Sequence, residues 1–470
     1  MAELKVDKIL PATGSSISLS ESGKTVLIPS GATLDASAAT LSGIGARVDY
    51  CTSVQSSPFT AAAGKGYFIN TGSAVTVTLP SSPSAGDEII VIDSTGQAAT
   101  NNITLGRNTN KIKGLCACAT LKTDRVGVRI IYSGSSQGWV TVTSANETPP
   151  VLDQTLYVTA TGGTVTTCGD FKIHTFTSDA TFSVSCAGTS SGSNKVDYLV
   201  VAGGAAGGQD VGGGGGAGGL RIGAVTVPGC APPAVAPGGL PVTVTSYPIT
   251  VGGGGASAST PGATGANGSN SIFSTITSTG GGGGGSYQPS PGMTGASGGS
   301  GGGGSGVAPS TGGAGNTPPT TPSQGNSGGG TTPGGAGAQG GGGGGASAAG
   351  VNGINCQGGA GGSGTNVTSI FGASPKPYYA ADVPTAGPTS TGIFAGGGGG
   401  GPRGPGFAPG HVAQGGNGGG GDGRENGTET SYAGVTNSGG GGGAGPGGAS
   451  PQVGASGGSG VVIIRYKFQN

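Results

Sequence analysis

Hydrophobic and polar residues alternate in short stretches over the first third of the chain, as in β-strands with one buried face. Between residues 48 and 145 five such stretches are separated by Gly, Ser, Pro and Asn. They read VTVTLP, EIIVID, NITLG, VGVRIIY and GWVTV, at residues 75–80, 88–93, 102–106, 126–132 and 138–142. Evenly spaced strands with turn residues between them predict an all-β sandwich or barrel. Trp139, the only tryptophan, is expected in its core.

Similar alternation continues on both sides of this region. Residues 1–45 carry shorter alternations, which predict short strands that need partner chains in order to fold. Residues 155–190 add TLYVTATGG and FKIHTFTSDATFSVS, where His174 is expected on a sheet face. Further on, VDYLVVAGG at 196–204 and GVVIIRYKF at 460–468 enclose most of the remaining chain. A sheet that pairs these two segments would close the domain on itself.

Runs of glycine recur between those two segments. They occupy residues 212–216, 252–255, 280–285, 301–304, 340–345, 396–401, 418–421 and 439–443. One glycine-rich tract is usually a flexible linker, but repetition indicates an array, and the strict triplet period of collagen is absent. The extended left-handed helix with three residues per turn makes no internal hydrogen bonds, so its backbone groups need outside partners. We therefore predict a bundle of polyglycine II helices, held by lateral hydrogen bonds and anchored by the β segments.

The connections between runs give the candidate binding residues. A run of six residues spans only about 19 Å, so the chain must soon reverse and its connections collect at two ends. The connections at 286–297, 346–356 and 402–414 are shorter than those at 305–327, 365–394 and 422–438. We assign the longer set to a functional tip and the shorter set to a base, which makes Tyr287 a weaker candidate.

The longer set contains aromatic and charged residues that suit recognition of a cell-surface sugar or protein when rigidly held loops display them. The alternative is that the aromatic residues pack the stems of the loops. The predicted receptor-binding residues are Phe371, Tyr378, Tyr379, Asp382, Asp422, Arg424, Glu425 and Tyr432.

Composition and charge exclude several classes of protein. Of the 470 residues 33% are hydrophobic and 8% are charged, with 19 Lys and Arg against 19 Asp and Glu. Because the net charge is zero, self-repulsion does not hold the chain open as in charged disordered proteins. The same balance argues against nucleic-acid binding. The opening MAELKVDKIL does not resemble a signal peptide and no apolar run is long enough for a transmembrane helix, so we expect synthesis and assembly in a cytoplasm.

Catalytic and metal-binding constellations are not apparent. The two histidines have no nucleophile and acid at useful spacing. A carboxylate pair formed by Asp422 and Glu425, as in sugar-cleaving enzymes, is less favoured, because two acids in a solvated loop are usually surface charge. Most of the seven cysteines are interpreted as small buried residues, and a bridge between Cys168 and Cys186 is less favoured than free thiols in a reducing compartment. We expect no enzyme activity, no metal and no cofactor.

Several blocks resemble phage proteins. ELKVDKILPATGSSISLSESGKTVLIPSGATLD resembles the N-terminus of structural and tail-fibre proteins of phages that infect marine bacteria, including cyanobacteria. VTVTLPSSPSAGDEIIVIDSTGQAATNNITLGRNTNKIKG resembles the β domain that follows in them. TATGGTVTTCGDFKIHTFTSDATFSV, VDYLVVAGG, GGGGGAGGLR and GSGVVIIRY are similar to the glycine-rich domain of phage tail-fibre adhesins.

This resemblance implies a homotrimeric fibre in the virion. Its N-terminal part would contact other tail or baseplate proteins, and its C-terminal part would face a host receptor, either a polysaccharide or an outer-membrane protein. The expected function is that of a receptor-binding adhesin. The alternative is a virion decoration fibre without a role in host range, and a sugar-degrading tailspike is a third class, weakened by the scarcity of acids.

The chain is accordingly expected to be all-β, with four parts. Residues 1–47 form an attachment and trimerisation segment, 48–148 a β-sandwich domain, 149–195 a connecting β domain, and 196–470 the polyglycine II domain with its tip loops.

Overall fold

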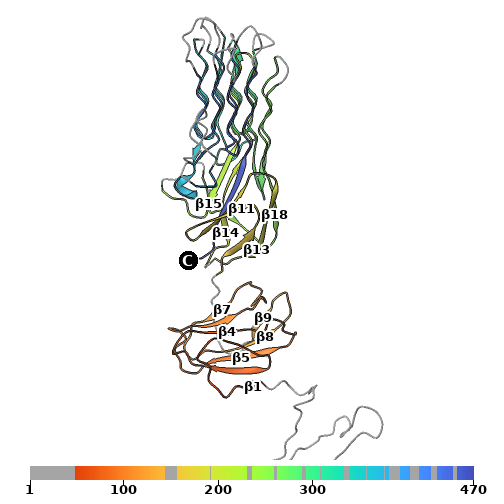
Figure 1. Ribbon diagram of the computed structural model, residues 1–470, viewed down its shortest axis with the longest axis vertical. Helices are drawn as coiled ribbons and strands as arrows, with labels where there is room; N and C mark the ends of the chain where they lie inside the picture. Colours follow the sequence, from red (N-terminus) through yellow and green to blue (C-terminus); the bar gives the residue numbers. More distant parts are fainter. Residues whose placement is uncertain are drawn as a thin grey trace, which may run out of the picture.

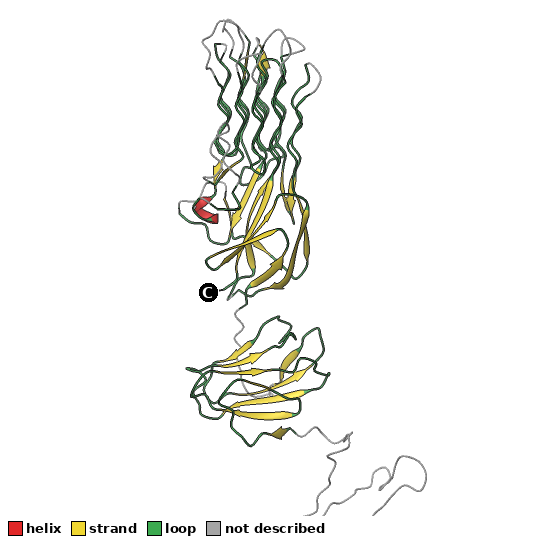
Figure 2. Cartoon of the chain, viewed as in Figure 1, coloured by secondary structure: helices red, strands yellow, loops and turns green. Residues whose placement is uncertain are grey.

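The computed structural model describes residues 48–142 and most of residues 156–469. The gaps in the second range are residues 191, 230–234, 259–261, 288–292, 307–308, 333–337, 356, 375, 380–391, 403–411, 425–430 and 448–452. The predicted attachment segment, residues 1–47, lies outside the described residues. The described chain is almost entirely β-structure and extended backbone, with one short helix (Figure 2), so the predicted all-β class is confirmed.

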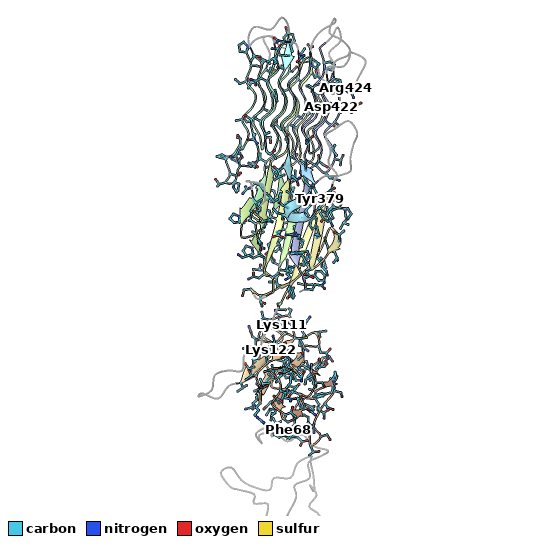
Figure 3. All side chains as sticks on the ribbon, turned by 90° about the vertical axis from the view of Figure 1, so that its left-hand side faces the viewer. Phe68, Lys111, Lys122, Tyr379, Asp422 and Arg424 are labelled. Atoms are coloured by element: carbon cyan, nitrogen blue, oxygen red, sulfur yellow. The ribbon has the colours of Figure 1, made fainter. Side chains whose placement is uncertain are left out.

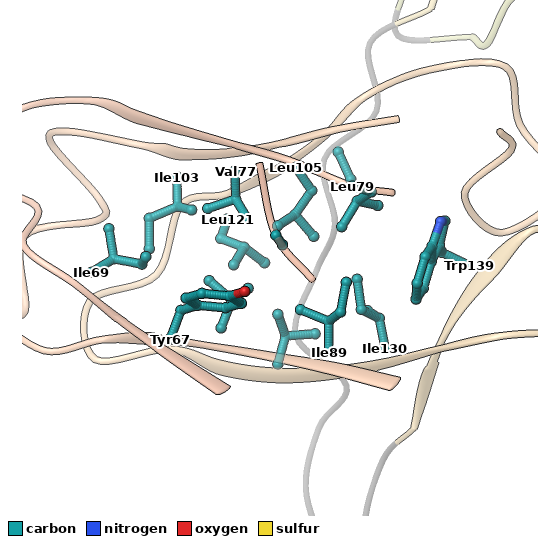
Figure 4. Packing of buried hydrophobic residues seen from close by; sticks show 14 of the residues in the cluster. Tyr67, Ile69, Val77, Leu79, Ile89, Ile103, Leu105, Leu121, Ile130 and Trp139 are labelled. Atoms are coloured by element: carbon teal, nitrogen blue, oxygen red, sulfur yellow. The ribbon is translucent and has the colours of Figure 1, made fainter. Parts of the chain in front are cut away.

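Residues 48–142 form two β-sheets with one hydrophobic core between them (Figures 1 and 4). One sheet has the order β1 (Asp49–Tyr50), β3 (Lys65–Ile69), β5 (Glu88–Asp93), β8 (Gly127–Tyr132) and β9 (Trp139–Val142). The other has the order β2 (Phe59–Thr60), β4 (Val75–Thr78), β6 (Ile103–Gly106) and β7 (Ala119–Leu121). Of the two architectures predicted for this region, the sandwich is therefore the one observed.

The chain crosses between these sheets at every step from β1 to β6. Neighbouring strands of one sheet are therefore parallel there, as in the pairs β3 with β5 and β4 with β6. Alternate side chains point inward, and Val75 and Val77 of β4 are buried. Trp139 is fully buried at one end of the row of aliphatic side chains in Figure 4, which confirms its predicted place in the core.

The residues from 156 onward form a second unit with two further sheets. The five-stranded sheet has the order β10 (Val158–Thr161), β13 (Ala180–Ala187), β18 (Ser246–Thr250), β19 (Ser271–Phe273) and β20 (Ile276–Ser278). The seven-stranded sheet contains β11 (Thr164–Cys168), β12 (Phe171–Phe176), β25 (Val461–Lys467), β14 (Lys195–Val201), β15 (Leu220–Ala224) and β16 (Val235–Pro237) in that order, and β17 (Leu240–Pro241) also pairs with β14. Short pairs complete the unit: β21 (Ser305–Gly306) with β22 (Gln339–Gly340), and β23 (Thr365–Asn366) with β24 (Ile393–Phe394), beside helix α1 (Thr368–Phe371).

The last strand of the chain lies inside the seven-stranded sheet. β25 is antiparallel to β14 on one side and to β12 on the other. The prediction that the segments at 196–204 and 460–468 pair and close the domain is thus confirmed. Both sheets also mix strands from before and after residue 195, so the strands of residues 158–187 share their sheets with the glycine-rich part.

An aromatic core fills the space between these two sheets. Phe182 and Phe273 come from the five-stranded sheet, and Tyr466 comes from the seven-stranded sheet. His174 of β12 belongs to this layer, where it is fully buried and contacts Phe182 and Tyr466. Its ring nitrogens lie 2.7 Å from the Gly162 carbonyl oxygen and 3.0 Å from the Tyr466 hydroxyl. Burial lowers the pKa of His174, so the neutral ring is the folded form.

Beyond the sheets the chain runs back and forth in extended passes, drawn as loops above the strands in Figure 2. We call the end of each pass beside the strands the sheet end and the opposite end the far end. The passes away from the sheets are 203–208, 252–255, 280–285, 300–304, 326–330, 349–353, 395–401, 420–424 and 439–445. The returning passes are 212–219, 265–270, 295–299, 312–316, 339–345, 358–364, 413–417, 431–435 and 453–460.

The pass at residues 212–218 shows how these segments are held. Its N–H groups donate to three neighbouring passes, and the same neighbour returns every third residue. The acceptors for residues 213–218, in order, are the carbonyl oxygens of Gly285, Gly341, Gly442, Gly282, Gly344 and Gly439. A repeat of three is that of the extended left-handed helix, whose backbone groups radiate in three directions.

The carbonyl oxygens of the same pass accept from three further neighbours. The donors to residues 212–217, in order, are the N–H groups of Gly401, Gly208, Gly303, Gly398, Ala205 and Ser300. Six passes therefore surround this one, and each is joined to it by backbone hydrogen bonds. The prediction that the glycine runs form one ordered lattice is confirmed.

Lateral hydrogen bonding from all sides leaves no room for a side chain at interior glycines such as Gly214 and Gly215. A Cβ atom on Gly214 would lie 2.0 Å from the Gly398 carbonyl oxygen, and one on Gly215 would lie 2.1 Å from that of Ala205. Such separations are far below contact distance, so these two positions must be glycine even though their φ angles are ordinary.

We expect Gly215→Ala to destabilise the second unit by about 2 kcal/mol or more, because its methyl group must push a bonded pass away. The exposed Ala314 on an outer pass provides the control Ala314→Ser, which should change stability little. Chemical denaturation of the purified chain measures both. Equal stability of the two variants would contradict the interior lattice position of Gly215.

His174 predicts a pH dependence of stability. Above its ordinary pKa of about 6.5 the ring is neutral in both folded and unfolded chains. Below that pH the unfolded chain binds a proton while the buried ring, whose pKa is lowered, resists protonation, so stability falls as the pH drops from about 7 to about 5.5. His174→Gln should flatten the melting temperature across this window. A slope unchanged in that variant would assign the effect to other groups.

Candidate functional site

The two ends of the lattice differ in what they carry, and they do not match the predicted base and tip. The pass 280–285 is followed by the returning pass 295–299, and the pass 395–401 by 413–417, so each pair is joined at the far end, although both connections belong to the predicted base. The returning pass 312–316 is followed by the pass 326–330, and 358–364 by 395–401, so each pair is joined at the sheet end, although both connections belong to the predicted tip. The assignment of short and long connections to opposite ends is therefore wrong, because several segments without a long glycine run are returning passes of the lattice and not connections.

Three of the predicted binding residues are buried beside the seven-stranded sheet. Phe371 of α1, Tyr378 and Tyr379 are 1%, 5% and 8% exposed and pack against strands β14, β15 and β25. Figure 3 places Tyr379 at the level of the sheets, below the lattice. The expectation that these aromatic residues are exposed at a tip is wrong, and the alternative that they pack a loop stem describes them.

Hydrogen bonds hold this aromatic cluster together. The hydroxyls of Tyr378 and Tyr379 donate to the carbonyl oxygens of Phe371 and Gly372. The two tyrosine rings meet edge to face with centroids 4.9 Å apart. Burial raises the pKa of Tyr378 to about 12 and raises the pKa of Tyr379 as well, so both remain protonated donors. Their role is to attach the described segment around α1 to the sheet.

Three other predicted residues meet toward the far end of the lattice. Asp422 and Arg424 lie on one pass and Tyr432 on the next, and the Tyr432 N–H donates to the Asp422 carbonyl oxygen at 3.1 Å. The Arg424 guanidinium carbon lies 4.3 Å from the centre of the Tyr432 ring, a cation–π contact. Figure 3 places Asp422 and Arg424 at the side of the upper lattice. All three residues are partly exposed.

The carboxylate of Asp422 belongs to the same group. Its Oδ1 accepts the Gly415 N–H at 2.8 Å from a third pass. Burial raises the pKa of the Asp422 carboxyl, against the lowering effects of that hydrogen bond and of the Arg424 charge. A planar cation on an aromatic face beside a carboxylate presents a surface for hydroxyl groups and for flat polar groups of a ligand. The remaining predicted residues, Asp382 and Glu425, lie outside the described residues.

The comparison with known families addresses the second unit. Residues 177–467 match a family model described as a glycine-rich domain, and the match spans more than half of the chain. The chain belongs to this glycine-rich domain family. No curated protein matches the chain. The match begins between β12 and β13 and ends at the last residue of β25, so it includes the lattice and the strands of both sheets from β13 onward, while β10, β11 and β12 precede it.

The glycine-rich domain also presents far-end residues that the predicted binding set does not contain. Tyr287 lies two residues after the pass 280–285 and is half-buried at the far end, not at a base. Ile354 lies in the far-end turn after residue 353 and is 49% exposed, and Val351 on the same pass is 53% exposed. The sequence signal for Val351 and Ile354 is a large apolar residue beside asparagine in a glycine-rich stretch, as in VNGIN at 351–355, because the glycines around it have no side chains to bury it.

Other candidate chemistry is scarce in the described residues. No cluster of three or more His, Cys, Asp or Glu side chains there could hold a metal ion. No helix in this part of the chain is long and apolar enough to cross a membrane. Cys168 and Cys186 are free thiols, and they lie on β11 and β13 of different sheets, so the bridge considered between them is not formed.

Proposed function

We propose that the chain is a phage tail fibre, a non-enzymatic adhesin that attaches the virion to the host surface through the far end of its glycine-rich domain. The observation that carries this proposal is the lattice, which presents several connections together at one end, opposite the sheets. The sequence resemblance to tail-fibre adhesins supports the same assignment. The protein would then act in the virion after assembly in the host cytoplasm, joined through its N-terminal part to other tail or baseplate proteins.

Rigidity is the physical reason that such a lattice suits adhesion. Loops on a rigid scaffold lose less conformational entropy when they bind, so more of the contact energy becomes affinity. Asp422, Arg424 and Tyr432 offer an aromatic face, a cation and an acceptor within one such group. A polysaccharide or the polar loops of an outer-membrane protein match that chemistry. The bonded passes keep the group in place before the receptor arrives.

The alternative remains a virion decoration fibre without a role in host range. Neither the lattice nor the match to the glycine-rich domain family distinguishes it from an adhesin. A sugar-degrading tailspike is less favoured, because Asp422 accepts a backbone hydrogen bond and lies beside Arg424 in the described group.

For the adhesin, Arg424→Ala combined with Tyr432→Ala should reduce phage adsorption to host cells about tenfold, the effect of losing an aromatic and arginine hot spot. The melting temperature should stay near that of the wild type, since both residues are partly exposed. Adsorption kinetics of phage that carry the variant measure the effect. Asn417→Ala, at an exposed sheet-end turn, is the matched control.

Other results would decide between the alternatives. Unchanged adsorption of the double variant, together with unchanged host range after exchange of the far-end connections, would favour the decoration fibre. Release of reducing sugars from host polysaccharide by the purified chain would support a sugar-degrading tailspike instead.

We further propose that the fibre is a homotrimer that uses the outer pass 252–255 as a contact between copies. Gly253 and Gly254 are exposed glycines of the lattice, whereas other outer passes expose residues such as Ala314. A Cβ atom on Gly253 would meet no atom within 4 Å, and its φ is not positive. Within the described chain nothing therefore requires glycine there, and close approach of another backbone supplies a reason.

The backbone groups of this pass support the same contact. The N–H groups of Gly253 and Gly254 donate no hydrogen bond to another described residue, and the Gly254 carbonyl oxygen accepts none from one. Three parallel passes around a threefold axis would each supply donors and an acceptor, as in the collagen arrangement of extended helices. Parallel passes would also keep all three far ends on the same side.

Cysteine cross-linking tests this arrangement in the full chain. Gly253→Cys should give cross-linked dimers under mild oxidation, because three copies bring their residues 253 together at the axis, whereas Ala314→Cys should give none. Light scattering of the wild type should give the mass of three chains. A monomeric mass would contradict the trimer, and a trimer without cross-linking at residue 253 would place its contact elsewhere.

A further inference from the structure

The two outward sides of the β-sandwich at residues 48–142 carry different kinds of side chain. Successive side chains of a strand point to opposite sides of its sheet, so residues that alternate with core residues face outward. On the sheet of β2, β4, β6 and β7 the outward side chains of the strands are all threonines, namely Thr60, Thr76, Thr78, Thr104 and Thr120. We call this the threonine side, and polar residues of this kind are the ordinary outer surface of a sandwich.

The outward side of the other sheet is mostly apolar. In β5 the core residues Ile89 and Val91 alternate with Ile90 and Ile92, and Figure 4 shows Ile89 pointing into the core. The strand registers place the outward residues of β1, β3, β8 and β9 on the same side as Ile90. We call this side the apolar face, and its apolar residues are Tyr50, Phe68, Ile90, Ile92, Ile131, Val140 and Val142. None of them belongs to the core between the sheets.

Tyr50 lies across one edge of the apolar face. A Cβ atom on Gly66 of β3 would lie 2.5 Å from the Tyr50 ring, and the rings of Tyr50 and Phe68 stack with their centroids 5.6 Å apart. Tyr50 is nonetheless 43% exposed, and Val142 at the opposite edge of the sheet is 41% exposed. Apolar surface therefore extends over the whole width of the sheet.

The charge on the apolar face is neutralised within the face. Glu88 and Arg129 are the two charged residues on the outward side of these strands, and they form an ion pair. Arg129 Nη2 donates to Glu88 Oε2 at 2.7 Å, and Arg129 Nε donates to the other carboxylate oxygen. The face therefore presents no net charge to an ionic ligand. A contiguous apolar patch indicates a surface that another element covers, whereas the threonine side of the same sandwich needs no cover.

The size of the apolar face argues against a second copy of the chain as its occupant. Five strands about 4.8 Å apart and about five residues long cover roughly 400 Å². A stable interface between separate proteins buries about 800 Å² on each partner, and separate partners also lose translational and rotational freedom. A segment of the same chain avoids that loss, because its tether gives it a high effective concentration at the face.

Residues 1–47 join the sheet at the apolar face. They lie outside the described residues, and the described chain begins at Val48 and continues into β1, the edge strand that contributes Tyr50 to the face. The sheet is about 20 Å wide, a distance that about six extended residues span. Residues 1–47 contain four basic and four acidic residues, so their balance of charge matches the neutral face. Their stretch SISLS at 16–20 alternates apolar and polar residues, which predicts a strand with one side against an apolar surface.

We propose that the apolar face is the docking surface for residues 1–47 of the same chain, which form a third layer on the β-sandwich. The short apolar stretches of this segment then gain the buried surface that they cannot supply themselves. The N-terminal part of the chain is thereby fixed to the sandwich. The proposal does not depend on the adhesin function, because it concerns a unit other than the glycine-rich domain and its tests use the purified chain.

Photo-crosslinking of the full chain tests what covers the apolar face. p-Benzoylphenylalanine in place of Ile131 should form an adduct with a peptide from residues 1–47 within one chain. Val142, at the exposed edge, is a second site in case replacement of Ile131 impairs folding. The matched control places the same group at Thr104, in the middle of the threonine side, where no adduct with residues 1–47 should form. Denaturing electrophoresis and peptide mass spectrometry identify the products.

Other products of this experiment would overturn the proposal. An adduct with the mass of two chains would assign the apolar face to a second copy. Absence of an adduct with residues 1–47 from both position 131 and position 142 would show that this segment does not cover the face. Equal capture of residues 1–47 at position 104 would show that its contact with the sandwich is not specific.

Limited digestion with trypsin gives an independent measure of docking. Docking should protect the bond after Lys24, so Ile90→Ser with Ile131→Ser should speed cleavage there at least about tenfold, because the docked state loses buried apolar contacts. Thr104→Ser with Thr120→Ser, on the threonine side, is the matched control and should leave the rate unchanged. An unchanged rate of cleavage after Lys113, in an exposed turn of the sandwich, shows that the variants stay folded. Equal rates after Lys24 in the wild type and in the isoleucine variant would contradict docking.

Discussion

The hydrogen bond between neighbouring glycine passes is the interaction on which the second unit depends. Each such bond contributes only about 0.5–1.5 kcal/mol net, whereas fixing one residue costs roughly 1–2 kcal/mol, so the lattice cannot stand on its own bonds. The remaining stabilisation comes from the two apolar layers of the sheets. One is the aromatic core around Phe182 and Tyr466, and the other is the cluster that contains Phe371, Tyr378 and Tyr379. Phe371, Tyr378 and Tyr379, which lie in a connection between passes, therefore anchor the lattice to the sheets.

The order of strands ties this stabilisation to the end of the chain. β14 begins the glycine-rich stretch and β25 ends it, and the two lie side by side with β12 on the other flank. Because β25 occupies the middle of the sheet, β12 and β14 have no common neighbour until the last segment is in place. β14 and β25 thus make the contacts between residues that are far apart in the sequence. The entropy cost of closing the chain between them grows only slowly with its length. The pairing of β14 with β25 therefore closes a long intervening chain at a modest entropic cost.

The sequence predicts the regular parts of this structure well, and the predictions that are wrong have a common physical cause. The predicted strand at 88–93 is identical to β5 and the pairing of the two terminal segments is as expected, because alternation and apolar runs report burial directly. The end of the lattice at which a connection lies is not predictable from the glycine runs alone. An outer returning pass such as residues 295–299 needs glycine only on its inward side, so Ala296 and Ser297 interrupt the run. Likewise, nothing local distinguishes Tyr378 and Tyr379, which the sheet buries, from Tyr287, which lies at the far end.

Steric crowding fixes the residue type at interior glycines of the lattice but not in the connections at its far end. An interior glycine such as Gly215 lies in a pass with six bonded neighbours and has no space for a methyl group, so its replacement disturbs several passes at once. A far-end connection joins two passes whose bonds are made elsewhere, so a change in its length or side chains leaves the lattice bonding intact and costs little closure entropy. Asp422 and Arg424 lie at this boundary, where Asp422 is bonded into the lattice through its backbone and both residues are partly exposed at its surface. A scaffold with this division can change the chemistry that it presents while the passes behind that surface stay glycine.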